Sequence, residues 1–191
     1  MTKASRRELI LEAAAERIVQ VGIDALRLQD VARLAGVTPQ LLAYHFSNRS
    51  ALIVAALRYA ADRSPSISML HENGFDRAID TLRAALLAEF DEASEVRNLN
   101  LVWNEAAALP NADDELHRVL EEITRAWDER VMVGVLQCFA EGSMRNSGDP
   151  REIAVMLTTT VEGLSQSWLA GVLGVTEARR ALERLLDQYR A

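Results

Sequence analysis

The sequence predicts an all-α protein in which a small N-terminal helical domain precedes a larger helical domain. Apolar residues recur at the helical period of 3.6 along nearly the whole chain, without the sustained alternation that is typical of strands. Gly and Pro are sparse, with nine and four among 191 residues, and they separate the periodic segments from one another. Hydrophobic residues make up 49 % of the chain, which is enough for a packed core.

The N-terminal part contains four predicted helices, over residues 5–21, 28–34, 39–45 and 48–62. Gly22 ends the first helix, and Leu34 is expected to face inward with its neighbours in the second. Thr38 is predicted to cap the third helix, with Pro39 at the first helical position, where a missing N–H does no harm. Ser47 or Asn48 is expected to cap the fourth.

The rest of the chain is predicted to be helical over residues 75–93, 96–109, 112–141, 150–171 and 177–190. Asp149, Pro150 and Glu152 form a strong start signal, because Asp caps, Pro suits the first position and Glu follows three residues after the cap. Thr176 and Glu177 are expected to open the last helix.

Charge is divided unevenly along the chain. The formal net charge is −7, yet residues 1–60 hold eight Lys or Arg against five Asp or Glu, a local charge of +3 that leaves −10 for the remainder. Such a division indicates different roles for the two parts, and the basic part is the candidate for nucleic acid. The alternative is chance together with solvated helix faces.

Several classes of protein are disfavoured by the composition. No run approaches the roughly 18 to 20 apolar residues of a membrane span, and the charged N-terminus is unlike a signal peptide, so we expect a cytoplasmic protein. A single cysteine, Cys138, excludes an internal disulfide and is expected to be a buried small hydrophobe. No nucleophile–base pair, metal-ligand spacing or Gly-rich phosphate loop is present, so we expect no enzyme, metal or cofactor.

Residues 28–46 predict a helix-turn-helix, two short helices joined by a turn at Gly36. Gly36 permits a backbone turn that a side chain would strain, and Ala32 is small where the second helix crosses close to the first. Val31, Ala35, Val37, Leu42 and Phe46 would form the small core between the helices.

The outward face of the second short helix has the chemistry to read a DNA duplex, because the N-terminal turn of a recognition helix meets base edges in the major groove. Gln40 can pair with adenine, and Thr38 and Leu41 can contact a thymine methyl group. Tyr44 and His45 offer hydrogen-bond donors to phosphate. Arg33 is left open between a phosphate contact and an ion pair with Asp30.

Residues 9–57 resemble the N-terminal domain of the TetR family of bacterial transcription regulators. The resemblance is carried by Ile10, Ala13, Ala14, Gly22, Asp30, Val31, Ala32, Ala35, Gly36, Val37, Thr38, Leu42, His45, Phe46, Arg49 and Leu52. Three positions depart from the family pattern: Ala43 replaces a phosphate-binding Tyr, Arg49 often replaces Lys, and Arg27 stands where Ser or Thr is usual. The predicted DNA-binding set is therefore Arg27, Gln29, Thr38, Pro39, Gln40, Leu41, Tyr44, His45 and Arg49.

The resemblance implies a homodimer that binds a near-palindromic double-stranded operator and responds to an unknown small-molecule effector. It implies a DNA-binding domain over 1–47 and a ligand-binding and dimerisation domain over 48–191, with helix 48–62 as the connector. A repressor is expected; the alternative is a regulator that responds to a protein partner or has no effector.

Residues of the larger domain are assigned by the same resemblance. Candidate effector-pocket residues are Phe90, Trp103, Trp127, Met132 and Trp168, for which core packing is the alternative. The last two helices are expected to form the dimer interface through Leu157, Val161, Leu164, Trp168, Leu182, Leu185, Leu186 and Tyr189.

Overall fold

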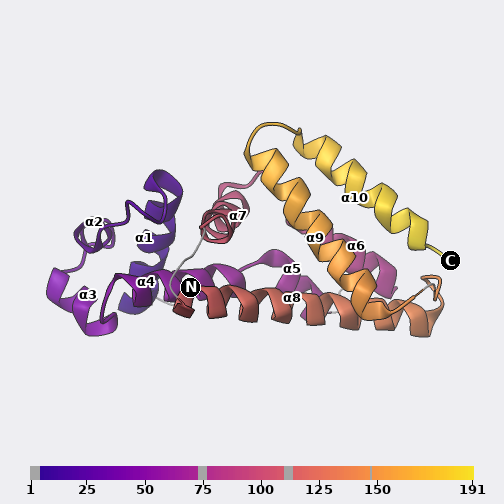
Figure 1. Cartoon of the computed structure of the whole chain (residues 1–191), viewed down its shortest axis with the longest axis horizontal. Helices are drawn as coiled ribbons and strands as arrows, with labels where there is room; N and C mark the ends of the chain where they lie inside the picture. Colours follow the sequence, from indigo (N-terminus) through magenta and orange to yellow (C-terminus); the bar gives the residue numbers. More distant parts are fainter. Residues whose placement is uncertain (1–4, 73–76, 110–113, 147) are drawn as a thin grey trace. The chain divides into compact units, whose positions relative to one another are not determined.

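A computed structural model describes residues 5–72, 77–109, 114–146 and 148–191, and its regular structure is helical, which confirms the predicted fold class (Figure 1). Within these residues the only strand-like pairing is an isolated bridge between Met144 and Arg190. The described helices are α1 (Arg6–Val21), α2 (Leu28–Leu34), α3 (Pro39–His45), α4 (Arg49–Asp62), α5 (Pro65–Glu72), α6 (Ala78–Ala88), α7 (Ser94–Ala107), α8 (Asp114–Glu141), α9 (Pro150–Leu169) and α10 (Val175–Tyr189). None of them is long and apolar enough to cross a membrane.

The helix α5 was missed by the sequence prediction. Ser64 and Pro65 were taken as the end of one helix, but they begin the next, because Pro65 occupies a first helical position where no N–H is required. The carbonyl of Ser64 accepts a hydrogen bond from the Ile67 N–H at 3.2 Å.

Other helix boundaries differ by a few residues from those predicted. The segment 75–93 was too long: α6 ends at Ala88, and Phe90 is buried in the following turn, with its N–H bonded to the Leu87 carbonyl at 3.1 Å. Apolar periodicity continues past the helix because Phe90 still fills the core. Residues 75–76 and 112–113 of the predicted helices lie outside the described residues. The last helix opens at Gly174, whose N–H bonds the Glu177 carboxylate at 3.0 Å, rather than at Thr176.

By packing, the chain divides into two compact units. The first unit comprises residues 1–62 and 101–122, and the second comprises residues 63–100 and 123–191. The predicted boundary between residues 47 and 48 concerns function rather than packing, and it stays a prediction.

The first unit is built around the apolar stripe of α1. Ile10, Ala14 and Ile18 are fully buried, and α1 packs against both α2 and α4. Ser5 and Glu8 form a capping box at the start of α1, which satisfies two N–H groups that the helix cannot pair internally. At the start of α4 the cap is Asn48, whose Oδ1 accepts from the Ala51 N–H at 2.8 Å.

The second unit has its own core. Its buried members are Ile79, Leu82, Leu86, Leu87, Phe90, Val131, Val135, Cys138, Met144, Ile153, Ala154, Leu157, Val161, Ala178, Leu182 and Leu186. Gly134 permits close packing of α6 on α8, because a Cβ there would lie 3.2 Å from the Leu82 side chain. Cys138 is buried as predicted, and this burial raises the pKa of its thiol to about 11.

One carboxylate is buried in the second unit. Glu89 follows α6, and the hydroxyls of Ser64 and Ser66 both donate to its Oε1. Asn100 of α7 donates its side-chain amide to the Glu89 carbonyl at 2.8 Å. Loss of solvation raises the pKa of Glu89, although its hydrogen bonds oppose that shift.

The raised pKa of Glu89 predicts a pH dependence of stability. A carboxyl group whose folded pKa is raised contributes stability below its ordinary value of 4.5, and this contribution is lost as the pH rises through the folded pKa. Glu89→Gln keeps an acceptor oxygen for both serines but cannot ionise. We therefore expect it to reduce the fall in the free energy of unfolding between about pH 4.5 and neutral pH, measured by urea unfolding.

The exposed Glu92 supplies the matched control, since Glu92→Gln removes a carboxylate from the same loop without changing a buried group. A pH slope for Glu89→Gln equal to that of the unmodified chain would contradict the prediction.

Candidate nucleic-acid interface

The turn between α2 and α3 depends on Gly36. Its φ is +63°, a left-handed conformation that L side chains rarely adopt. The Val37 N–H bonds the Ala32 carbonyl at 3.0 Å across this turn, and Ala32 itself is only 2 % exposed. The predicted roles of both residues are therefore consistent with the structure, and together they fix the direction in which α3 leaves the turn.

The helix α3 is held at both ends and along one face. The Thr38 side chain accepts from the Leu41 N–H at 3.2 Å, and Pro39 follows it, which confirms the predicted cap. At the other end the Phe46 N–H bonds the Leu42 carbonyl at 2.9 Å. Leu42 and Phe46 are both buried, so the opposite face of α3 is directed outward.

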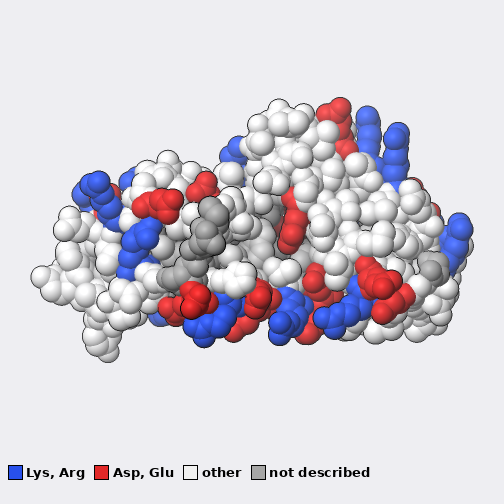
Figure 2. All heavy atoms as spheres, viewed as in Figure 1, with Lys and Arg blue, Asp and Glu red and all other residues white. Residues whose placement is uncertain are grey.

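That outward face carries most of the predicted contact residues. Thr38, Pro39 and Gln40 are exposed, and Tyr44 is the most exposed large residue of the unit at 83 %. Leu41 and His45 are half-buried, and the rings of His45 and Tyr44 meet edge to face at 5.3 Å. The seven residues of α3 include no Lys, Arg, Asp or Glu, so this end of the unit is white in Figure 2, with basic side chains over the neighbouring α2.

The helix α2 contributes exposed polar groups beside α3. Arg27 and Gln29 are exposed, and Arg27 makes no side-chain cap, as expected from its departure from the family pattern. Arg33 pairs with Asp30 at 3.0 Å while staying 78 % exposed, and Arg17 approaches the same carboxylate at 3.6 Å. Leu34, expected to face inward, is 43 % exposed, because the buried side of this short helix is already filled by Val31 and Ala32.

Arg49 has a structural task that the sequence did not reveal. Its Nε donates to the Leu26 carbonyl at 3.0 Å, and its Nη2 donates to the Ile23 carbonyl. Both acceptors belong to the loop between α1 and α2. The predicted phosphate contact of Arg49 stays a prediction, and the guanidinium that would make it is already shared with this loop.

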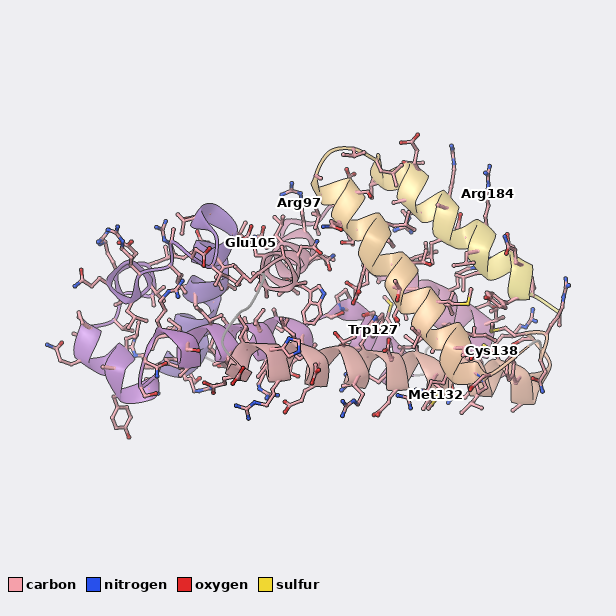
Figure 3. All side chains as sticks on the ribbon, in the orientation of Figure 1. Arg97, Glu105, Trp127, Met132, Cys138 and Arg184 are labelled. Carbon is pink, nitrogen blue, oxygen red and sulfur yellow. The ribbon has the colours of Figure 1, made fainter. Side chains whose placement is uncertain are left out.

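A second group holds the same loop. The Ile23 N–H donates to the carboxylate of Glu105, at 3.3 Å, and Figure 3 labels Glu105 on α7. Gly22 beside it has a φ of +79°, and a Cβ there would lie 3.0 Å from the Glu105 oxygen. Sequence reasoning missed Glu105, because its partner is 82 residues away and no local motif marks the pair.

The structure gathers four of the five predicted effector-pocket residues around one core. Phe90 and Trp168 have ring centroids 6.2 Å apart, and Trp127 and Met132 pack against the same cluster. Phe90 is only 1 % exposed, so it serves as a core residue. Trp103 belongs by packing to the other unit.

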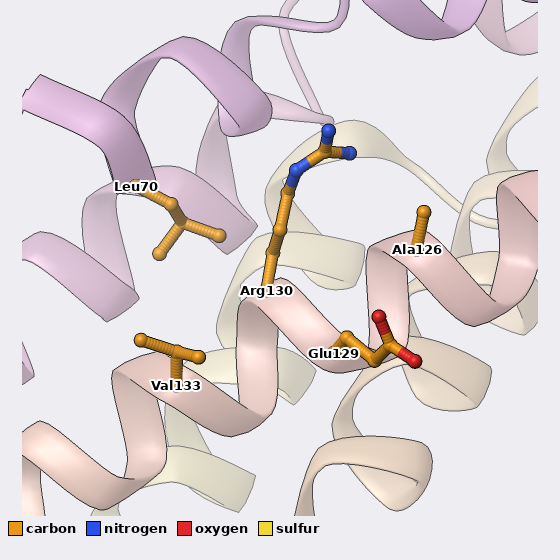
Figure 4. A pocket seen from close by; sticks show the side chains of 5 residues that line it. All are labelled: Leu70, Ala126, Glu129, Arg130 and Val133. Atoms are coloured by element: carbon orange, nitrogen blue, oxygen red, sulfur yellow. The ribbon is translucent and has the colours of Figure 1, made fainter.

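A surface groove of about 410 Å³ lies between α5 and α8 in the second unit (Figure 4). It is lined by Leu70, Ala126, Glu129, Arg130 and Val133, none of which was predicted. Arg130 points into the groove, as Figure 4 shows, between apolar side chains.

The predicted dimer-interface residues need a correction. Leu157, Val161, Leu182 and Leu186 are at most 4 % exposed, because they pack into the core of their own subunit. Leu164, Trp168, Leu185 and Tyr189 are half-buried against that core. Helical periodicity shows which face of α9 or α10 is apolar, but it cannot distinguish an internal contact from one between subunits. The large apolar side chains that α9 leaves exposed are Val155 and Met156.

Comparison with known proteins gives matches along most of the chain. Residues 10–56 match a family model described as bacterial regulatory proteins of the tetR family, and residues 78–191 match one described as the C-terminal part of BetI-type transcriptional repressors. A crystal structure of a putative TetR-family transcriptional regulator from Rhodococcus sp. is 39 % identical, covers 97 % of this chain and 98 % of its own, and has a TM-score of 0.89.

Two more distant proteins share this similarity. The HTH-type transcriptional regulator TtgR of Pseudomonas putida is 24 % identical over 85 % of this chain and 80 % of its own length. A putative transcriptional regulator from Saccharomonospora viridis, crystallised in complex with choline, is 21 % identical over 95 % of each chain with a TM-score of 0.83, which shows the same fold.

The two hydrogen bonds of Arg49 predict a loss of stability on substitution. Arg49→Ala should lower the free energy of unfolding by about 1–3 kcal/mol, because two loop carbonyls lose a charged donor. Arg49→Lys should restore only part of this loss, since a single ammonium cannot reproduce the guanidinium fork. Urea unfolding measures both.

Arg33→Ala is the matched control, because Arg33 is mostly exposed and an exposed ion pair contributes roughly 1 kcal/mol or less. If Arg49→Ala were as stable as Arg33→Ala, the loop contacts would carry no energy and the structural role would be wrong.

Proposed function

The chain belongs to the TetR family of bacterial regulatory proteins and is a DNA-binding transcription regulator, and we propose that it is a homodimeric repressor released from its operator by a small molecule. The observation that carries the proposal is the presentation of α3. A left-handed turn at Gly36, a Thr38 cap and two buried anchors leave Gln40 and Tyr44 exposed on one face.

The exposed residues divide into two tasks. Gln40 lies in the first turn of α3, where a recognition helix meets base edges, and its amide can bond the N6 and N7 atoms of adenine. Thr38, Pro39 and Leu41 surround it and offer apolar contacts to thymine methyl groups. Tyr44, His45, Arg27 and Gln29 supply donors to phosphate, which add affinity without sequence information. Tyr44 assumes the task of the Tyr that the family has at the position of Ala43.

Dimerisation follows from the shortness of α3. Seven residues read only a few base pairs, and a two-fold axis doubles the site that is read. The exposed side of α9 supports an interface there, since Val155 and Met156 are 40 % and 51 % exposed and Thr159, Gly163 and Gln166 continue the face without charge. Basic side chains of α10, among them Arg184, border this area in Figures 2 and 3.

The second unit is the candidate effector domain. A protein of the same fold has been crystallised in complex with choline, so this fold accepts a small molecule. A ligand releases DNA only if it binds the non-binding spacing of the two recognition helices more tightly than the binding one. The helix α4 leads from the helix-turn-helix toward the second unit, and we assign it the role of connector.

Sequence preference tests the base-reading role of Gln40. Gln40→Ala should reduce the preference for the operator over unrelated DNA by roughly tenfold or more, since a bidentate pair contributes about 1–3 kcal/mol of discrimination. Tyr44→Phe, which removes only a hydroxyl group, should weaken binding to both DNAs alike. Fluorescence anisotropy with a fragment selected from DNA flanking the gene measures each affinity over a range of salt concentrations.

Affinity for the operator should fall steeply with salt, because phosphate contacts release counterions. Equal loss of operator and unrelated DNA on Gln40→Ala, or an affinity that salt hardly changes, would refute this division of tasks.

Oligomeric state tests the interface on α9. Met156→Asp should shift the dimer toward monomer, because two carboxylates would be buried together near the two-fold axis. Val133→Asp on α8 is the matched control, since Val133 is 50 % exposed against 51 % for Met156. Sedimentation equilibrium should give an unchanged dimer for the control. A Met156→Asp dimer as tight as the control would place the interface elsewhere.

A further inference from the structure

Two acidic side chains face each other where α8 and α9 pack in the second unit. The Thr158 hydroxyl of α9 donates to Asp128 Oδ1 of α8 at 2.6 Å, which joins the two helices at this level. Glu162 lies four residues after Thr158 and therefore on the same face of α9. Asp128 and Glu162 are both half-buried, so they are neither freely solvated nor closed off from a ligand.

The negative charge at this place lacks compensation. Among the residues that the structure describes, the ion pairs all lie elsewhere, and Asp128 accepts only from the neutral Thr158. Burial raises the pKa of Glu162, and the nearby negative charge of Asp128 raises it further, with no cation acting in the opposite direction. Two carboxylates that repel each other in a partly buried setting favour a positively charged guest.

An unpartnered hydroxyl lies beside the two acids. Ser165 is 5 % exposed, and its Oγ has no hydrogen-bond partner in the described part of the chain. It follows Glu162 by three residues and Thr158 by seven, so it points to the same side of α9. A buried hydroxyl that neither donates nor accepts is unfavourable, and a guest that contacts its oxygen removes the deficit.

Aromatic surfaces border the acidic pair. Trp127 immediately precedes Asp128 on α8, where Figure 3 labels it, and Trp168 follows Ser165 by three residues on α9. Both are half-buried and pack against the same core. The faces of indole rings attract organic cations, and quaternary ammonium groups in particular.

We propose that the α8–α9 face formed by Asp128, Thr158, Glu162 and Ser165 is the effector site and that its ligand is a small organic cation. The ammonium group lies between the two carboxylates, Ser165 Oγ contacts it or an adjoining hydroxyl, and Trp127 and Trp168 cover its apolar substituents. This assignment rests on the proposed ligand-responsive function, and it gives that function a chemical class of effector.

Three probes of similar size and different charge test the assignment. Thermal shift and calorimetric titration of the full chain are carried out with tetramethylammonium, the neutral tert-butanol and the anionic pivalate, at matched ionic strength. Tetramethylammonium alone should raise the melting temperature and bind saturably. An equal response to tert-butanol, or no response to the cation, overturns the proposal.

Substitutions locate the binding. Glu162→Gln and Asp128→Asn keep size and hydrogen-bonding oxygens while removing charge, and each should weaken the cation by about tenfold. Glu129→Gln is the matched control, because Glu129 is the exposed neighbour of Asp128 and lies outside the set. Unchanged melting temperatures without ligand show that the variants are folded. If Glu129→Gln weakens binding as much as Glu162→Gln, the cation is held by general acidity and the site is wrong.

Operator binding, measured on the same samples, separates this inference from the proposed function. A chain that binds its operator but neither binds the cation nor releases DNA in its presence refutes the effector class alone. A chain that binds no operator refutes the proposed function, whatever the cation does.

Discussion

The turn at Gly36 is the constraint on which the recognition surface depends. A left-handed backbone there sends α3 across α2, and the crossing is close enough that Ala32 is almost fully buried. Because Leu42 and Phe46 then occupy the only apolar space available, the rotation of α3 about its own axis is set as well. Gln40 and Tyr44 are exposed as a consequence of this packing. A larger residue at Ala32 or a strained one at Gly36 would displace every candidate DNA contact at once.

The loop between α1 and α2 is the second fixed point. Arg49 bonds two of its carbonyls and Glu105 bonds one of its N–H groups, so a segment without regular structure is held from two sides. The helix α7, which carries Glu105, takes part in both packing units, since its Asn100 bonds the Glu89 carbonyl in the other unit. A displacement of α7 therefore acts directly on a backbone group next to the helix-turn-helix. This gives the effector domain a covalently continuous route to the reading head besides α4.

Much of the fold and of the nucleic-acid face was predictable, for a local reason. The Gly36 turn, the Thr38 cap and the outward direction of Gln40 follow from interactions within about ten residues, and sequence spacing records such interactions. The contacts of Glu105 and the internal bonds of Arg49 join residues 23 to 82 positions apart, and no short pattern records those. The same limit explains the interface correction, because the apolar stripe with Leu157 and Leu182 looks alike whether a subunit or its partner covers it. The helix α5 was lost because Pro65 was taken as a stop signal when it was a start.

The uneven charge of the chain restricts how a cationic effector can act. The residues after position 60 carry −10, so a bound monocation reduces the net negative charge of the part that phosphate repels. By long-range electrostatics alone, that change favours DNA binding slightly, and it is screened at physiological salt. Release by a cation must therefore come from geometry, through a difference in how tightly the two spacings of the recognition helices hold the ligand. The acidic pair spans α8 and α9, so a guest between Asp128 and Glu162 changes the packing of the helix that carries the exposed Val155 and Met156 surface. In a homodimer built on that surface, the effector and the spacing of the two reading heads would be coupled through one helix.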